Sequence, residues 1–223
     1  MHNVNGLLVG GVDEAGRGSI IGPLVIAGIS FRKASISKLR KIGVKDSKAL
    51  TPKSRATLFG QLKEMAQSLY IYKIDCSVID ENVYSNRLNR LEAKIMAHVI
   101  NKLQADKVYV DSCDVNPRRY RDYIRSYLPT LKLKLYSMHH ADSISVVVSA
   151  ASIVAKIIRD QEVEKIRQTY CNIGSGYPCD SMTMRFIRQW VSKHKSPPTF
   201  ARKSWKPLRH MLEEIEQYKL TQF

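Results

Sequence analysis

Near the start of the chain runs the segment Leu7-Leu8-Val9-Gly10-Gly11-Val12-Asp13-Glu14-Ala15-Gly16-Arg17-Gly18. Its apolar first half is typical of a buried strand, and its glycines indicate a loop directly afterwards. Two adjacent carboxylates, Asp13 and Glu14, therefore stand where the strand ends and the loop begins. A carboxylate pair in this place can hold a divalent cation, and the bare backbone of Gly16 and Gly18 lets another chain approach closely.

The chain as a whole is strongly basic. Its 223 residues include 36 Lys and Arg against 20 Asp and Glu, which gives a formal net charge of +16. Such an excess favours polyanions, because basic side chains displace the counterions that a polyanion holds. We therefore expect nucleic acid as the partner, with a solubilising surface charge or attraction to anionic membrane as alternatives. At 44% hydrophobic residues, the chain is long enough for one core and a small additional lobe.

The sequence contains neither a secretory signal nor a membrane span. The N-terminus lacks a basic start and an apolar stretch, and the longest apolar region, 144–158, is interrupted by serines and Lys156. We therefore expect a cytoplasmic protein that contacts no membrane. The cysteines are widely and irregularly spaced, at Cys76, Cys113, Cys171 and Cys179. They form no Cys-x-x-Cys pair that would suggest zinc, so we expect ordinary thiols, with a disulfide as the open alternative.

The pattern of apolar residues predicts an α/β fold. Runs bounded by turn residues predict strands at about 6–13, 23–31, 69–76, 107–111 and 131–136. Helical spacing predicts helices over 58–69 and 88–99, and a short helix should begin near Pro117. This order indicates a mixed five-stranded sheet flanked by helices, in which an antiparallel meander is extended by parallel crossovers.

The C-terminal part predicts a small helical lobe. After the break at 174–178, amphipathic patterns predict one helix around residues 186–190 and another over 208–218. We expect two domains: a catalytic domain over 1–168 and a substrate-binding lobe over 169–223. Candidates to face a nucleic-acid duplex are basic residues of the lobe: Lys193, Lys195, Arg202 and Lys206.

Two further acids occupy positions where a charge is otherwise hard to explain. Asp111 ends the predicted strand 107–111, and open α/β sheets place their sites beyond the carboxyl ends of strands. Asp142 should begin, at residue 142 or 143, a long helix that runs to about 168 and is buried in its first half. At a helix start the carboxylate can cap free amides, which is an equally good structural role.

Together, four acids predict a metal site: Asp13, Glu14, Asp111 and Asp142. Each acid alone is better explained as a cap or a surface ion pair. If the ends of their elements meet at one rim of the sheet, however, the mutual repulsion of the carboxylates requires cations, and oxygen ligands suit magnesium or manganese.

The adjacent pair poses a geometrical question, because neighbouring residues of a regular strand point to opposite faces. Glu14 reaches the same site as Asp13 only if the backbone turns. Otherwise Glu14 supports the metal ligands without binding a metal itself, or binds through its backbone carbonyl. Asp13 is then the ligand that bridges the metals.

The glycine loop at 16–22 superficially matches a dinucleotide-binding fingerprint. Such a site needs a helix that begins at the loop, so that its amides hold a pyrophosphate. Here residues 23–29 predict another strand, so we expect a hairpin. Its glycines would let a sugar-phosphate backbone approach the main chain, with Arg17 available for phosphate.

Short segments along the chain occur in an order typical of one family. They are 11–18, 46–50, 110–112, 141–142, 148–156 and 174–178. On these segments the chain resembles type 2 ribonucleases H, the ribonuclease HII group, and particularly its archaeal and eukaryotic catalytic chains. The resemblance spans nearly the whole chain. It implies an RNase H-like fold and a four-carboxylate site at Asp13, Glu14, Asp111 and Asp142 that binds two magnesium or manganese ions.

The resemblance also implies a reaction. Members of the family hydrolyse the RNA strand of RNA/DNA hybrids and nick duplex DNA on the 5′ side of embedded ribonucleotides, leaving 3′-hydroxyl and 5′-phosphate ends. Gly16, Arg17 and Gly18 match the loop that senses the ribose 2′-hydroxyl. Tyr177 matches a tyrosine that stacks on the neighbouring deoxyribose, and Lys48 corresponds to a basic residue near the substrate phosphates.

Other interpretations of the same residues stay open. A non-catalytic basic RNA-binding protein explains the charge, but its carboxylates would be unfavourable near a polyanion. Ribonuclease HIII shares the chemistry, but we expect too short a segment before Asp13 for that group's additional substrate-binding domain. Tyr177 alone is equally well explained by packing of the lobe on the sheet. Like the archaeal and bacterial proteins that it resembles, the chain is expected to act as a monomer.

Overall fold

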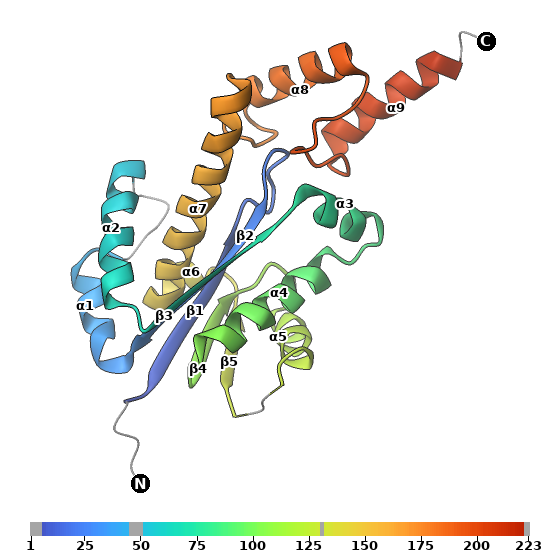
Figure 1. Ribbon diagram of the computed structural model, residues 1–223. Coiled ribbons are helices and arrows are strands. Elements are labelled where there is room, and N and C mark those ends of the chain that lie inside the picture. The colour runs from blue at the N-terminus through green and yellow to red at the C-terminus, as the bar shows by residue number, and fades with distance from the viewer. Residues whose placement is uncertain (1–5, 45–50, 130–131, 221–223) are drawn as a thin grey trace. The chain divides into compact units, whose positions relative to one another are not determined.

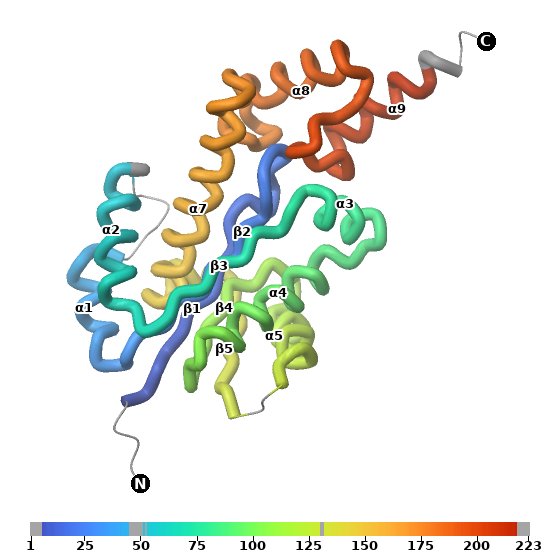
Figure 2. Tube along the Cα trace, viewed as in Figure 1, coloured from blue at the N-terminus to red at the C-terminus, as the bar shows by residue number. Residues whose placement is uncertain are grey.

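The computed structural model describes residues 6–44, 51–129 and 132–220 (Figure 1). The chain divides into two compact units: Met1–Ala15, Val25–Tyr72 and Asn89–Ile158 in the first, and Gly16–Leu24, Lys73–Leu88 and Arg159–Phe223 in the second. Figure 2 traces the path of the chain through both. The predicted domains 1–168 and 169–223 remain a proposal, and two segments of the second unit come from far before residue 168.

A mixed five-stranded sheet forms the centre of the first unit (Figure 1). Its strands are β1 (Leu8–Ala15), β2 (Leu24–Arg32), β3 (Ser68–Ile74), β4 (Lys107–Asp111) and β5 (Lys134–Met138), in the order β3-β2-β1-β4-β5. β1 pairs with β2 in the antiparallel sense, whereas β4 pairs with both β1 and β5 in the parallel sense. The predicted fold class is confirmed, and each strand lies within a few residues of its predicted place.

Helices fill the intervals between the strands and follow the last of them. They are the 3-10 helix η1 (Lys33–Ser35), α1 (Ile36–Lys41), α2 (Pro52–Met65), α3 (Cys76–Tyr84), α4 (Leu88–Leu103), α5 (Pro117–Ser126), α6 (Ala141–Ile144), α7 (Val146–Tyr170), α8 (Ser181–His194) and α9 (Lys206–Leu220). Sequence explains several of their starts. Thr51 and Asn116 accept hydrogen bonds from backbone amides of the first turns of α2 and α5, and each is followed by a proline.

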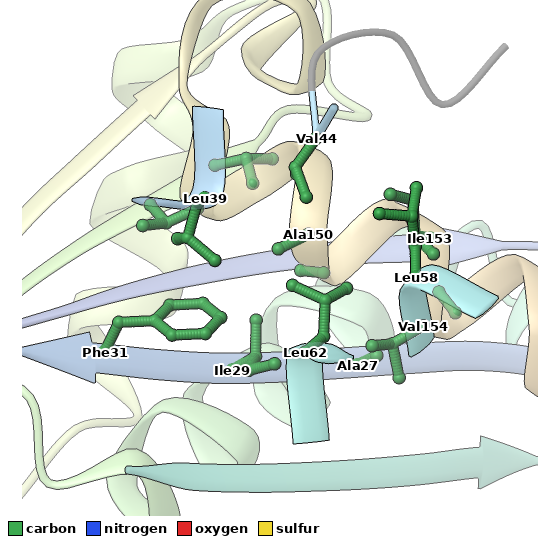
Figure 3. Close-up of a cluster of buried hydrophobic side chains, with 14 of the residues drawn as sticks. Ala27, Ile29, Phe31, Leu39, Val44, Leu58, Leu62, Ala150, Ile153 and Val154 are labelled. Atoms are coloured by element: carbon green, nitrogen blue, oxygen red, sulfur yellow. The ribbon is translucent and has the colours of Figure 1, made fainter. Parts of the chain in front are cut away.

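One face of the sheet is covered by α1, α2 and the first half of α7. Figure 3 shows the buried side chains of β2 facing those of the three helices. The closest approach is between β1 and α7, where a Cβ on Gly11 would lie only 2.1 Å from the backbone oxygen of Val147. Only glycine fits there, so the start of α7 lies directly against the strand that carries the acidic pair.

The opposite face is covered by α4 and α5. A Cβ on Gly28 of β2 would lie 2.5 Å from a methyl carbon of Val99, so α4 also packs closely against the sheet on this side. Met96 of α4 and Tyr120 of α5 are fully buried, and the Tyr120 hydroxyl lies 3.3 Å from the Met96 sulfur. The alternating side chains of β1 therefore point to two different helical layers.

The second unit has its own apolar core. Ile20 and Ile21 of the β1–β2 loop are fully buried with side chains of α7, α8 and α9, among them Val163, Ile187 and Leu208. Ile21 also forms an isolated antiparallel bridge with Ala201. The two predicted C-terminal helices are present as α8 and α9, and the loop after β1 packs with them in this unit.

Two predicted helices end or begin elsewhere. The long helix predicted from residue 142 is interrupted by Ser145, which is extended and separates α6 from α7. Serine is favoured at the start of a helix, and its carbonyl accepts the amide of Ser149 at 2.9 Å. The helix predicted over 58–69 ends at Met65, so Leu69 belongs to β3. The short helices α1 and α3 were not predicted.

No helix in the described ranges is long and apolar enough to cross a membrane. All four cysteines are free thiols, as the sequence predicts; Cys76 is buried, whereas Cys171 and Cys179 are exposed.

Candidate catalytic site

Three of the four predicted acids lie near one edge of the sheet in the first unit. β1 and β4 pair in parallel with Val12 opposite Val110, so the next residues, Asp13 and Asp111, reach the same edge of the sheet. Asp142 lies in α6, which follows the neighbouring strand β5. Asp13 and Asp142 are only 4% and 8% exposed. The carboxyl ends of two adjacent parallel strands thus place Asp13 and Asp111 side by side.

The surroundings of Asp13 strongly affect its carboxyl group. Its pKa is raised from 3.8 to about 7, first because the group is buried and second because the charge of Asp111 lies nearby, with a smaller contribution from Asp142. The side chain of Ser152 and the backbone amide of Glu14, at 2.8 Å, donate hydrogen bonds that act in the opposite direction. The charges of Asp111 and Asp142 therefore oppose ionisation of the buried Asp13 carboxyl.

Asp111 also fixes the segment that carries Asp142. Its Oδ1 accepts the backbone amide of Ala141 at 2.7 Å. Ala141 is the first residue of α6 and immediately precedes Asp142, so one hydrogen bond ties the end of β4 to the start of this helix. His140, which precedes Ala141, adopts the left-handed conformation with φ 53°. This conformation turns the chain from β5 into α6.

Glu14 points to the opposite face of the sheet from Asp13. β1 continues regularly to Ala15, with Glu14 paired to Ile26 of β2, so the backbone does not turn between the two acids. The charge of Glu14 acts on Cys113 and Tyr120, which lie on the side of α4 and α5. The three aspartates thus lie near one edge of the sheet, whereas the side chain of Glu14 lies on the other face, and the predicted four-acid metal site stays a prediction.

Metal-binding capacity depends on the donor set. The aspartates offer only oxygen atoms, and their repulsion would be relieved by a divalent cation, so the residues fit magnesium or manganese. Within the part of the chain that the structure describes, no three His, Cys, Asp or Glu side chains stand close enough together to enclose an ion.

A buried acid behind the sheet was not predicted. Glu92 of α4 is fully buried, and its Oε2 accepts a hydrogen bond from the Cys113 thiol at 2.7 Å. Burial, together with the charges of Glu92 and Glu14, raises the pKa of Cys113, which keeps the thiol protonated. A signal was present in the sequence: Glu92 stands at helical spacing with the buried Met96, on the apolar stripe of α4.

The predicted sugar-sensing segments both lie in the second unit. Gly16 has φ 86°, and a Cβ there would lie 2.9 Å from the carbonyl oxygen of Pro23. Gly18 is exposed, and its carbonyl accepts the indole N–H of Trp205 at 3.3 Å. Tyr177 is half-buried, with its ring 4.4 Å from the Arg159 guanidinium carbon. Lys48 lies outside the described residues.

Arg202 has a different position from the one predicted. It was a candidate to face a duplex, but it is fully buried and donates hydrogen bonds to backbone carbonyls of Arg17, at 2.8 Å, and Gly22, at 3.0 Å. Buried Asp80 of α3 holds the next turn by accepting the amides of Lys203 and Ser204. The sequence does not distinguish this buried arginine from a surface one, because its neighbours in the sequence are also basic.

Aspartates at the carboxyl ends of parallel strands, in a chain this basic, indicate a hydrolase that acts on nucleic acid with bound metal ions. Comparison with known proteins defines the group. The family model described as Ribonuclease HII matches residues 10–208. A ribonuclease HII of Cenarchaeum symbiosum is 45% identical over 203 residues, which are 91% of this chain and 97% of the relative.

Solved structures agree with the sequence comparison. The crystal structure of ribonuclease H2 from Pyrococcus horikoshii superposes with a TM-score of 0.88 at 39% identity, covering 95% of this chain and all of the other. The ribonuclease HII of Archaeoglobus fulgidus, solved in complex with PCNA, gives a TM-score of 0.82 at 33% identity and covers 90% of this chain and 96% of its own.

The chain belongs to the ribonuclease HII family. It is therefore a metal-dependent ribonuclease H with an RNase H-like fold, and the alternative of a non-catalytic RNA-binding protein is set aside.

Proposed function

We propose that the protein hydrolyses the RNA strand of RNA/DNA hybrids and nicks duplex DNA on the 5′ side of embedded ribonucleotides, leaving 3′-hydroxyl and 5′-phosphate ends. The observation that carries the proposal is the buried position of Asp13 beside the charges of Asp111 and Asp142. Like charges beside a buried carboxylate are costly unless cations join them, and such ions can catalyse phosphodiester hydrolysis.

The acids have distinct roles in this proposal. Asp13, Asp111 and Asp142 would hold two magnesium or manganese ions. Bound ions supply an activated water and stabilise the leaving 3′ oxygen. Ser152 and the Glu14 amide hold the Asp13 carboxylate by hydrogen bonds, which orients it for this task. Glu14 would contribute its backbone carbonyl to the metal site, or would support Asp13 without binding a metal ion itself.

Recognition of the sugar belongs to the second unit. The loop Gly16, Arg17 and Gly18 would contact the ribose 2′-hydroxyl, which distinguishes RNA from DNA without reading bases. Tyr177 would stack on the neighbouring deoxyribose, and Lys48 would lie near the substrate phosphates. The exposed basic residues of α8, which include Arg185 and Arg188, would attract the duplex backbone. We further propose that the protein acts as a monomer in the cytoplasm.

A protein partner is added by the comparison. The Archaeoglobus fulgidus relative was solved with PCNA. We therefore extend the proposed partners from hybrid and ribonucleotide-containing DNA to a protein of the PCNA type.

The test is cleavage of a DNA duplex that carries one ribonucleotide. Wild-type protein is expected to nick it on the 5′ side when magnesium or manganese is added and to be inactive in chelator. Asp13→Asn and Asp111→Asn should lower the rate by roughly a hundredfold or more, because each removes a charged oxygen ligand. Asp122→Asn is the matched control, since Asp122 is 62% exposed and pairs with Arg121 on α5. Wild-type-like nicking by Asp13→Asn would refute the mechanism.

A further inference from the structure

Arg159 lies between two segments that the proposed function assigns to sugar recognition. It belongs to the second unit, as do the loop at 16–22 and the turn at 174–177. Its side chain is 6% exposed. One nitrogen, Nη2, donates to the carbonyl oxygen of Ser175 at 2.7 Å, and the guanidinium carbon lies 4.4 Å from the centre of the Tyr177 ring.

The fit around Arg159 is tight on both sides. A Cβ on Gly16 would lie 3.1 Å from the Arg159 Cγ, and a Cβ on Gly176 would lie 2.8 Å from its Nη2. Both glycines have positive φ, 86° and 84°. The two segments also bond directly, because the carbonyl of Gly176 accepts the amides of Ile20 at 2.8 Å and Ile21 at 3.1 Å. Arg159 therefore fills the space that separates the loop from the tyrosine.

A second buried arginine holds the other side of the same loop. Arg202 donates to Arg17, Gly22 and the Ser19 hydroxyl, and these four hydrogen bonds have lengths of 2.8 to 3.2 Å. The loop is thus fixed by two buried guanidinium groups, one on its backbone carbonyls and one against Gly16. Neither group is exposed enough to serve as a surface phosphate ligand.

Stability alone does not explain Arg159. The Nε of this buried side chain has no hydrogen-bond partner within the described residues, and a buried donor without an acceptor is unfavourable. Its ion pair with Asp160, at 3.3 Å, is half in solvent. A methionine of similar length would fill the space without that cost. A buried arginine with an unpaired donor is expected where the arrangement of its neighbours has to be precise.

We propose that Arg159 is a positioning residue for ribose recognition, which sets the Tyr177 ring and the Gly16–Gly18 loop at one fixed separation. The inference rests on the proposed function, since it gives these two segments a shared substrate. A planar guanidinium can lie flat on the ring and bond Ser175 at the same time. An ammonium group cannot do both, so Arg159→Lys keeps the charge but loses the arrangement.

The experiment compares two substrates. One is duplex DNA with a single ribonucleotide, in which a deoxyribose lies where Tyr177 is proposed to stack; the other is an RNA/DNA hybrid, in which it does not. Arg159→Lys is expected to lower kcat/KM on the first substrate by roughly tenfold more than on the second, since small displacements of a positioning group cost rate steeply. Arg209→Lys, an exposed arginine on α9 that pairs with Glu213, is the control and should keep the wild-type ratio.

A double-mutant cycle separates positioning from general destabilisation. If Arg159 acts through Tyr177, the variant Arg159→Lys/Tyr177→Ala should lose about as much activity on the single-ribonucleotide substrate as Tyr177→Ala alone. Should the lysine variant not fold, Arg159→Gln, which keeps a planar amide beside the ring, takes its place and is expected to show the same selective loss. Equal losses on both substrates, or multiplying losses in the double variant, would overturn the inference while the proposed function stands. Wild-type inactivity on both substrates would overturn both.

Discussion

Asp13→Asn should make the metal-free protein more stable at neutral and alkaline pH. The pKa of the Asp13 carboxyl is raised from 3.8 to about 7 in the fold. The folded protein therefore keeps a proton that the unfolded chain releases, and its free energy of unfolding falls as pH rises between these two values. A shift of about three pKa units corresponds to about 4 kcal/mol, which is fully lost above pH 7. Asparagine cannot ionise and escapes this loss.

The measurement is urea denaturation of wild type and Asp13→Asn in chelator, at about pH 4.5 and about pH 8. The difference in unfolding free energy between the two proteins is expected to move by up to about 3 kcal/mol in favour of the variant as pH rises, because about 1 kcal/mol is already lost at the lower pH. Magnesium should then stabilise wild type more than the variant, since ions bind the folded carboxylates.

The comparison of two proteins isolates one group. Asp111 and Asp142 titrate in both, so their contributions cancel to first order. Asp122→Asn, on the surface of α5, should follow wild type at both pH values. Parallel pH dependences for wild type and Asp13→Asn would show that Asp13 is not held neutral by burial and by its acidic neighbours, and the electrostatic basis of the metal site would have to be abandoned.

Two further predictions concern packing and thiol chemistry. Gly11→Ala should destabilise the protein by about 3 kcal/mol in urea denaturation, because its Cβ would overlap the Val147 carbonyl. Gly60→Ala on α2 is the control: a Cβ there meets nothing within 4 Å, so this variant should be more stable by about 0.5 kcal/mol. Equal effects of the two substitutions would contradict the close packing of Gly11 against α7. A disulfide reagent in native protein near pH 8 should label Cys171 and Cys179 rapidly and Cys113 slowly, because burial and nearby carboxylates raise the pKa of Cys113. Mass spectrometry of the labelled peptides gives the order in which the cysteines react. Fast labelling of Cys113 would contradict the prediction.

The sheet and the aspartate site were predictable because they depend on local patterns. The apolar run before Asp13 and the short strand before Asp111 each show a buried strand that ends in a carboxylate. Parallel pairing then brings the two ends together. The alternation of side chains along a strand also predicts that Asp13 and Glu14 face opposite sides unless the backbone turns. β1 continues regularly to Ala15, so the backbone does not turn between them.

Other features depend on tertiary contacts that a sequence does not display. Arg202 has basic neighbours in the sequence, and only the fold reveals that backbone carbonyls accept its hydrogen bonds in the interior. The helical spacing of Glu92 indicates a buried position, but only the fold reveals that the Cys113 thiol donates to it. The break at Ser145 was hidden because the apolar run continues on both sides of it, which indicates one buried helix. Helix α3 has nine residues and a weak apolar pattern, too little for periodicity to identify.

The raised pKa of Asp13 makes metal uptake an exchange reaction. At neutral pH a large part of the population carries a proton on this buried oxygen, and an arriving cation has to expel it before the carboxylate can become a ligand. Hydronium and magnesium therefore compete for the same atom. Lower pH should therefore weaken cation binding at this centre, and binding near neutral pH should release protons into the solution.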